Sequence, residues 1–258
     1  MLDQFREIWL VDFEFMCPPG ERPVPLCLAG REFRSGKLLR VWFDDSTAPQ
    51  QCPIPTGPDV LFVAYYASAE LGCYLAHRWP LPLRVIDLSC EFRNLTNEKP
   101  LLCGAGLLGA LAWFGLDAID AAEKNELREL AMRGGPYSQA ERVALLNYCQ
   151  TDVDSLNRLL PKIEPTINVA HALNRGRYMA AVARMEWNGV PIDTNKLTLF
   201  REHWTAIQSH LIAAVDADYG VFVPTNSAFD PTTQFGQAVA GVATEWEIDH
   251  RTNWPTLQ

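Results

Sequence analysis

The chain has 258 residues, of which 48% are hydrophobic and 21% charged, and its net charge is −9. Such a composition is typical of a globular protein with a substantial core, and the acidic balance argues against a basic surface for non-specific DNA binding. No apolar run approaches the roughly 18 residues of a membrane span, and the start, MLDQFRE, lacks the pattern of a secretory signal. We therefore expect a cytoplasmic protein without membrane contact.

The cysteines also favour a cytoplasmic protein. The seven cysteines are scattered and form no C-x-x-C pair, so a zinc site has little support. Reduced, buried thiols are the better interpretation.

The first third of the chain predicts strands. Glu7–Phe15 contains a continuous apolar run from Ile8 to Val11, which is typical of a central strand covered on both faces. The next elements are a hairpin, a second buried strand, a helix and a short strand, expected at Val24–Phe33 with Lys37–Phe43, Asp59–Tyr65, Ser68–Arg78 and Leu83–Leu88.

Helical periodicity dominates the middle of the chain. Three helices are expected, at Leu107–Phe114, Asp120–Met132 and Gln139–Leu160. The last opens with Ser138 followed three residues later by Glu141, as in a capping box. The order of strands and helices predicts an α/β fold, in which a mixed sheet is flanked by helices.

A domain boundary is expected near Pro165, which divides the chain into regions 1–164 and 165–258. Beyond it, two long helices are predicted at Asn168–Asn188 and Asn195–Asp218, joined by the turn NGVPID. The tail from about Val223 contains aromatic residues but shows no clear period.

Two carboxylates share one face of the first strand. Asp12 and Glu14 are two residues apart, and alternate side chains of a strand point to the same face. At about 4 Å two such charges repel by roughly 4 kcal/mol at an effective dielectric constant near 20. They could lie on the wet face of a half-buried strand, or they could bind a divalent cation through their oxygens. The apolar run beside them favours the cation.

Two later segments supply further polar groups. Glu70 falls in the first turn of the helix after the second buried strand, where a carboxylate also suits the helix dipole. Tyr148 and Asp152 are four residues apart and share one face of a late helix, whereas Asp154 points elsewhere. Taken singly, each has an ordinary structural explanation, as a dipole partner or as part of a polar stripe.

In combination, these residues resemble the motifs of the DEDD family of 3′–5′ exonucleases. The match is to its tyrosine-bearing branch, which includes the proofreading domain of A-family DNA polymerases and ribonuclease D. The family's D-x-E is matched by Asp12 and Glu14, and its Y-x-x-x-D by Tyr148 and Asp152. The resemblance implies a ribonuclease H-like mixed sheet flanked by helices, followed here by a smaller helical region.

The middle motif of the family departs from its usual form in this chain. Asn and, four residues later, Asp are replaced by Tyr66 and Glu70. A longer acid on a helix can still reach a metal ion, directly or through water. A further acid, Asp87 in VIDL, follows as an Asp does in many relatives, and we expect it to be structural.

The resemblance extends past the exonuclease motifs. Tyr178–Asp193, YMAAVARMEWNGVPID, is similar to the entry to the thumb of A-family polymerases. Nothing resembles the fingers or palm of these enzymes, so we expect no polymerase activity. The chain is therefore similar to the front part of a phage-type polymerase.

The resemblance implies a mechanism of phosphodiester hydrolysis at DNA 3′ ends, with two Mg²⁺ or Mn²⁺ ions. Asp12 would bridge both ions, and Glu14 and Asp152 would complete the site of the ion that binds the attacking water. Glu70 would support the second ion, and Tyr148 would orient the water through its hydroxyl. The substrate would be single-stranded DNA or a frayed 3′ end, in the context of a polymerase.

Apolar and basic side chains are candidates for contact with the substrate. Phe15 and Met16 lie beside the acids and could stack on or wedge apart the terminal bases. Arg175 and Arg177 recur along one predicted helix and could grip the DNA backbone.

Two other functions stay open. One is a catalytically weak domain that holds DNA ends or docks a partner, which the glutamate at position 70 keeps open. The other is an RNA-trimming relative of ribonuclease D, against which the thumb-like segment argues by analogy.

Overall fold

The computed structural model describes residues 2–44, 49–117, 121–219, 246–249 and 254–257. By its internal contacts the chain divides into two compact units, Met1–Val190 and Pro191–Gln258. The boundary expected near Pro165 falls inside the first unit, because helix α6 (Val169–Asn188) packs against helix α1 (Ala67–Ala76) and strand β5 (Val85–Asp87) of that unit.

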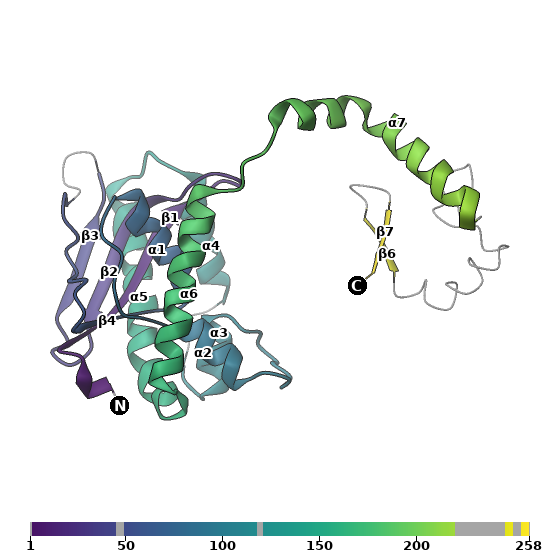
Figure 1. Cartoon of the computed structure of the whole chain (residues 1–258). Coiled ribbons are helices and arrows are strands. Elements are labelled where there is room, and N and C mark those ends of the chain that lie inside the picture. Colours follow the sequence, from purple (N-terminus) through teal and green to yellow (C-terminus); the bar gives the residue numbers. More distant parts are fainter. Residues whose placement is uncertain (1, 45–48, 118–120, 220–245, 250–253, 258) are drawn as a thin grey trace. The chain divides into compact units, whose positions relative to one another are not determined.

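The first unit is built on a five-stranded mixed sheet with the order β3-β2-β1-β4-β5 (Figure 1). The strands are β1 (Glu7–Met16), β2 (Val24–Glu32), β3 (Leu38–Trp42), β4 (Val60–Ala64) and β5 (Val85–Asp87). β2 pairs antiparallel with β1 and β3, whereas β4 pairs parallel with β1 and β5. The predicted α/β fold with a mixed sheet is confirmed, and each strand begins and ends within two residues of its predicted bounds.

Helices cover both faces of this sheet. On one face, Ile8 and Leu10 of β1 enter a core with α2 (Leu88–Leu95), α3 (Leu107–Trp113), α4 (Ala121–Arg133) and α5 (Gln139–Ile163). On the other, Trp9 and Val11 enter a core with α1 and α6. β1 is therefore buried on both faces, as its continuous apolar run predicts.

The ends of the helices follow from local sequence signals. The side chain of Ser138 accepts a hydrogen bond from the backbone N–H of Glu141, and the side chain of Glu141 accepts one from the backbone N–H of Ser138. The predicted capping box is therefore confirmed. Helix α2 is not among the predicted elements, although Leu88, Phe92 and Leu95 repeat at helical spacing. It starts directly after β5, so no turn separates the two elements in the sequence.

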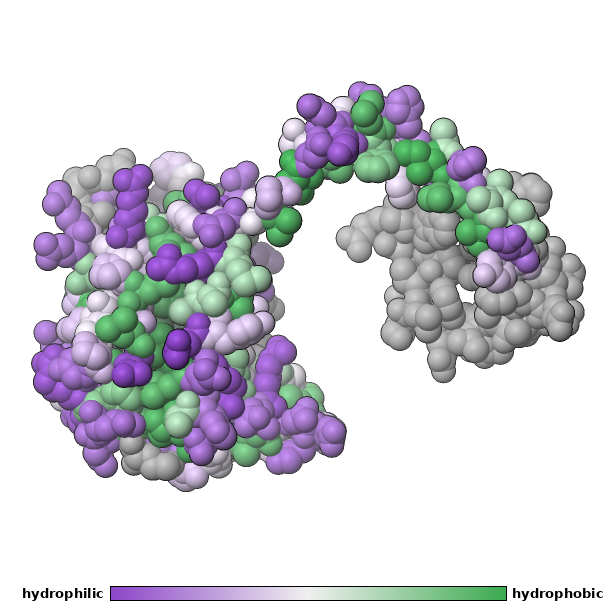
Figure 2. All heavy atoms as spheres, viewed as in Figure 1, coloured by the Kyte–Doolittle hydropathy of each residue, from purple (hydrophilic) through white to green (hydrophobic). Residues whose placement is uncertain are grey.

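The second unit contains helix α7 (Thr194–Tyr219) and two short antiparallel strands, β6 (Trp246–Asp249) and β7 (Trp254–Leu257). None of the residues of α7 is buried, and Figure 2 shows hydrophobic side chains along it. Most of the tail beyond Val223 lies outside the described residues. Within the described part of the chain, no helix combines the length and the apolar character needed to cross a membrane.

Candidate active site

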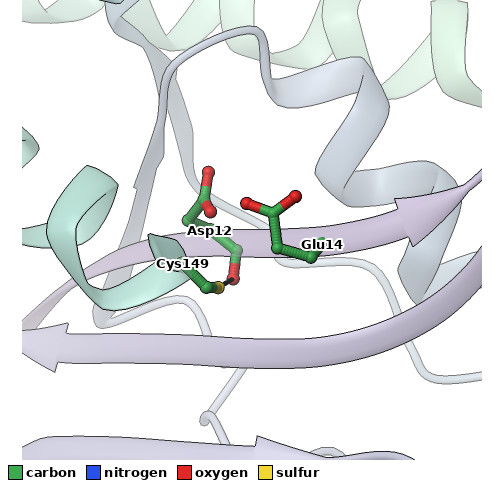
Figure 3. A group of neighbouring side chains, drawn as sticks. All are labelled: Asp12, Glu14 and Cys149. Atoms are coloured by element: carbon green, nitrogen blue, oxygen red, sulfur yellow. Dashed lines mark hydrogen bonds between the residues drawn. The ribbon is translucent and has the colours of Figure 1, made fainter. Parts of the chain in front are cut away.

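Strand β1 brings two carboxylates together near its end. Asp12 and Glu14 are paired with Ala29 and Cys27 of β2, and the register shifts just after Glu14, which marks a β-bulge. Bulges bend and twist a strand and recur next to active sites. Both acids are half-buried, and their carboxylates extend to the same side of the strand (Figure 3).

Glu70 joins this pair from the first turn of α1. Its side chain is 4% exposed and accepts a hydrogen bond from the backbone N–H of Phe13, which lies between the two acids of β1. Burial, and next the neighbouring charges of Asp12 and Glu14, raise the pKa of Glu70 well above its ordinary value. Among the described residues, its Oε2 atom has no hydrogen-bond partner.

Helix α5 supplies the remaining members. Tyr148 and Asp152 are both buried on one face of this helix. Burial raises the pKa of Tyr148, and the charge of Asp152 adds to the effect, so the phenol keeps its proton near neutral pH and can donate it in a hydrogen bond. Asp154 points elsewhere, as predicted, and accepts hydrogen bonds from Arg31 at 2.9 and 2.6 Å.

Cys149 also lies close to the acids of β1. One Sγ and one oxygen from each of Asp12 and Glu14 lie within 4.8 Å of one another. The thiol, however, donates a hydrogen bond to the backbone oxygen of Asp12 at 3.2 Å, and the carboxylate groups extend away from it (Figure 3). Burial raises the pKa of Cys149, which keeps the donor protonated. We therefore assign Cys149 to packing between α5 and β1 rather than to metal binding.

Two of the carboxylates lie at a hollow of about 360 Å³. Asp12 and Asp152 line it together with residues from the starts of α1 and α3 and from α2, namely Tyr65, Tyr66, Ser89, Arg93, Ala105, Gly106 and Leu107. The acids therefore face an open space in which a substrate can lie.

The four acids at and beside this hollow fit a hard divalent cation. Asp12, Glu14, Glu70 and Asp152 come from three elements, β1, α1 and α5, and all offer carboxylate oxygens. Such a set suits Mg²⁺ or Mn²⁺ better than zinc. A cation would also satisfy the buried Oε2 of Glu70, which otherwise lacks a partner among the described residues.

Asp87 has a structural role, as expected from the sequence. Its buried carboxylate accepts hydrogen bonds from the backbone N–H groups of Tyr66, Ala67, Ser89 and Cys90, at 2.8 to 3.2 Å. It therefore joins the start of α1 to the start of α2, and it fixes the end of α1 from which Glu70 projects.

The predicted apolar contacts, Phe15 and Met16, follow the acids on β1. Phe15 is half-buried and lines a second hollow of about 260 Å³, together with Tyr66 and Trp187. Met16, at the end of β1, is also half-buried. Neither side chain lines the hollow that contains Asp12.

The two predicted basic contacts lie on α6, away from the carboxylates. Arg175 donates hydrogen bonds to both carboxylate oxygens of Glu91 at 2.7 and 2.6 Å, and Glu91 is only 3% exposed. This bidentate pair joins α6 to α2. Arg177 is exposed, and neither arginine lines the hollow at the acids.

Arg93 and Ser89 are site residues that the sequence did not single out. Both lie on α2, the helix that is not among the predicted elements. The helical spacing of Leu88, Phe92 and Leu95 was the available signal, but nothing in the local sequence indicates that α2 borders the acids.

No protein-family model and no curated protein matches the chain. Several solved structures are similar to part of the chain. One, described as the apo form of a nuclease, has a TM-score of 0.47 and 13% identity, over 74% of this chain and 91% of the other. Brucella melitensis NrnC with bound Mg²⁺ has a TM-score of 0.46 and 14% identity, over 74% and 92%. The family B DNA polymerase from the hyperthermophilic archaeon Pyrobaculum calidifontis has a TM-score of 0.44 and 15% identity, over 69% and 27%. At such low identities and scores, the function of this chain has to be argued from its own site.

Proposed function

We propose that the chain is a metal-dependent nuclease and, more specifically, a 3′–5′ exonuclease that acts on DNA. The observation that carries the proposal is a cluster of acids. Asp12 and Asp152 line one hollow. Glu70 and Tyr148 lie close enough to Asp12, Glu14 and Asp152 for these charges to raise their pKa values. Clustered carboxylates with a buried, unsatisfied oxygen are costly in a folded protein unless a cation balances them.

The four carboxylates would hold Mg²⁺ or Mn²⁺, and the resemblance of the motifs to DEDD exonucleases supports two ions. Bound in this way, such ions make a water molecule more acidic and stabilise the leaving oxygen. Glu70 is suited to its part by its length. One oxygen reaches the backbone of Phe13 on β1, and the other is left for a cation.

Tyr148 would position the attacking water. Because its pKa is raised, its hydroxyl acts as a hydrogen-bond donor and not as the base. Its place one helical turn before Asp152 puts the hydroxyl and the carboxylate side by side on α5.

The direction of cleavage and the choice of DNA rest on the motifs. The spacing of D-x-E and Y-x-x-x-D supports removal of nucleotides from a 3′ end. The thumb-like segment Tyr178–Asp193, which spans the end of α6, supports DNA and a polymerase context. RNA trimming is the main competing activity.

The test uses 5′-labelled DNA and RNA strands of one sequence, and a DNA primer–template with a 3′ mismatch. Each is incubated with the protein in Mg²⁺, in Mn²⁺ and in EDTA. We expect stepwise loss of nucleotides from the DNA 3′ end with either ion, none in EDTA and none with Asp12→Ala. Asp154→Asn is the matched control, because this acid lies on α5 but pairs with Arg31 away from the hollow.

Preferential degradation of the RNA strand would replace the DNA assignment with that of a ribonuclease. Retained binding of DNA without cleavage in either ion would overturn the nuclease proposal and leave an end-binding domain.

A further inference from the structure

Tyr66 occupies an unusual position directly before α1. Its backbone lies in the left-handed region, at φ 74° and ψ 55°, which costs free energy for any residue with a bulky side chain. Its side chain is 52% exposed, so burial of the ring does not offset this cost. The same ring lines both the hollow at the carboxylates and the hollow at Phe15.

The fold explains the backbone of Tyr66 but not its side chain. The N–H of Tyr66 donates a hydrogen bond to Asp87 at 3.1 Å, and this contact fixes the start of α1. Asparagine or glycine would adopt the same conformation at lower cost. The ring is therefore a feature that the fold does not require, placed where the two hollows meet.

Arg93 faces the same hollow from the last turn of α2. It is the one basic side chain among the described residues that line that hollow, and it is exposed. Within the described part of the chain, no carboxylate forms an ion pair with it, in contrast to Arg175 on the neighbouring helix. A guanidinium at the hollow that Asp12 and Asp152 also line offers a planar pair of donors to an anion such as a phosphate.

We propose that Tyr66 and Arg93 form a subsite for single-stranded nucleic acid, in which the tyrosine ring stacks on a base and the guanidinium binds a backbone phosphate. The proposal rests on the proposed nuclease function and states how its substrate is held. Stacking accepts every base, because each has a π-face. Such a subsite suits an enzyme that removes successive nucleotides whatever their sequence.

The subsite is rigidly linked to the acids. Tyr66 lies one helical turn before Glu70 at the start of α1, and Asp87 ties this start to the helix of Arg93. A base stacked on Tyr66 would therefore hold the strand at a fixed position relative to the carboxylates. Bases inside a duplex are already stacked on their neighbours, so the strand would have to separate from its partner before successive bases could stack on the ring.

The first experiment measures hydrolysis of a 5′-fluorescein thymidylate strand by Tyr66→Phe and Tyr66→Asn. Asparagine tolerates the left-handed backbone, so this change removes the ring with the least disturbance of the fold. We expect KM to rise roughly 5- to 150-fold with Tyr66→Asn, the range of measured stacking contributions, and to stay within about twofold with Tyr66→Phe. Tyr219→Ala is the control, because Tyr219 is exposed to a similar extent, 59% against 52%, but lines neither hollow.

A strand with abasic residues at its 3′ end separates stacking from a structural effect. The wild-type protein should process it as poorly as Tyr66→Asn processes the intact strand, and Tyr66→Asn should cause no further loss. An unchanged KM in Tyr66→Asn, or an equal loss on intact and abasic strands, would overturn the role of Tyr66.

Arg93 is tested by salt dependence. Removal of one phosphate contact should lower the slope of log Kd against log salt by about 0.7 for a single strand. We expect this change in Arg93→Gln but not in Arg93→Lys, and not in Arg84→Gln, an exposed arginine outside the hollow. An unchanged slope in Arg93→Gln would remove Arg93 from the subsite.

Failure of the nuclease function would be seen separately, as the absence of Asp12-dependent cleavage by the wild-type protein. The subsite would then still be decided by fluorescence anisotropy with the same strands in EDTA. Weaker binding in Tyr66→Asn, but only for the intact strand, supports it, and equal binding by both proteins refutes it.

Discussion

Two regions of the first unit bury acidic side chains, and they do so in opposite ways. At the junction of β5 with α1 and α2, Asp87 is fully buried and accepts four backbone hydrogen bonds. At the end of β1, Glu70 is nearly as buried, accepts a hydrogen bond from Phe13, and keeps an oxygen without a partner among the described residues.

Glu32 shows that the first arrangement is the ordinary one in this protein. Its carboxylate accepts from the backbone of Ile8, Arg34 and Ser35 and from the hydroxyl of Ser35, at 2.6 to 3.1 Å. Buried acids that serve the fold are thus saturated by donors within the chain. Among the described acids, the cluster around Glu70 is the exception, and the proposed cation site would account for it.

The largest expected effect is a loss of hydrolysis on substitution of an acid in the cluster at the end of β1. Asp12→Asn should lower the rate of hydrolysis by roughly a thousandfold or more, because one carboxylate of the cation site is lost. Its melting temperature in EDTA should not fall, since the change removes a charge from a crowded site. A gel assay of strand shortening, with circular dichroism melting, measures both. Activity within tenfold of the wild type would remove Asp12 from the mechanism.

The next effect concerns stability. Asp87→Ala leaves four buried or partly buried N–H groups without their acceptor and should lower the free energy of unfolding by about 3 kcal/mol or more. Urea unfolding measures the change, with Asp154→Asn as a surface control. A loss of less than about 1 kcal/mol would show that water replaces the carboxylate and that the junction is not saturated in the way described.

Glu70→Gln should produce the reverse of the Asp87 result. Removal of the charge relieves repulsion with Asp12 and Glu14, so the melting temperature in EDTA should rise by roughly 2–6 °C at about pH 8. Addition of Mg²⁺ should stabilise the wild-type protein more than the variant, and hydrolysis should fall. A variant that is less stable than the wild type in EDTA would indicate that Glu70 serves the fold.

The dependence on pH sharpens the same comparison. Because the pKa of Glu70 is raised in the folded protein, protonation of Glu70 favours folding. Its contribution is fully present below the pKa of about 4.3 in the unfolded chain and is lost as pH rises towards the folded pKa. The stability difference between Glu70→Gln and the wild type, in EDTA, should therefore grow from about pH 5 to pH 8. A constant difference across that range would argue against a raised pKa.

The smallest effect is expected at Tyr66, which binds Asp87 through its N–H and lies one helical turn before Glu70. Tyr66→Asn relieves the left-handed strain and should raise the free energy of unfolding by about 1 kcal/mol, or the melting temperature by about 2–4 °C. A gain in stability with a loss of substrate binding would show that the ring is kept for function. A loss of stability would mean that contacts of the ring support the fold.

Much of the site follows from short-range periodicity. The two-residue period of a strand places Asp12 and Glu14 on one face, and the helical period does the same for Tyr148 and Asp152. The apolar run of β1 gives its burial on both faces. These features depend on residues a few positions apart, so they could be predicted before the fold was known.

Other features could not be predicted in this way, because they depend on which distant elements become neighbours. The sequence predicts Arg175 as a DNA contact from its place on a helix. In the structure, α6 lies close to α2, and the guanidinium of Arg175 pairs with Glu91. Arg93 belongs to a helix with no separate start signal, and it joins the acids only through the order of β4 and β5 in the sheet.

The amino-acid pattern was thus sufficient for the type of fold and for the acid pairs, since both arise from regular spacing along the backbone. The resemblance of the motifs implied one site for Glu70, Asp12 and Asp152, but local spacing alone did not place Glu70 beside them. The meeting of Tyr66 with Arg93 at one hollow came only with the tertiary structure. The parallel pairing of β4 with β1 and the packing of α5 across the sheet bring together groups that lie up to 140 residues apart, between Asp12 and Asp152. No local preference of the chain brings such distant residues together. Their proximity results from the burial of the two apolar cores on either side of the sheet.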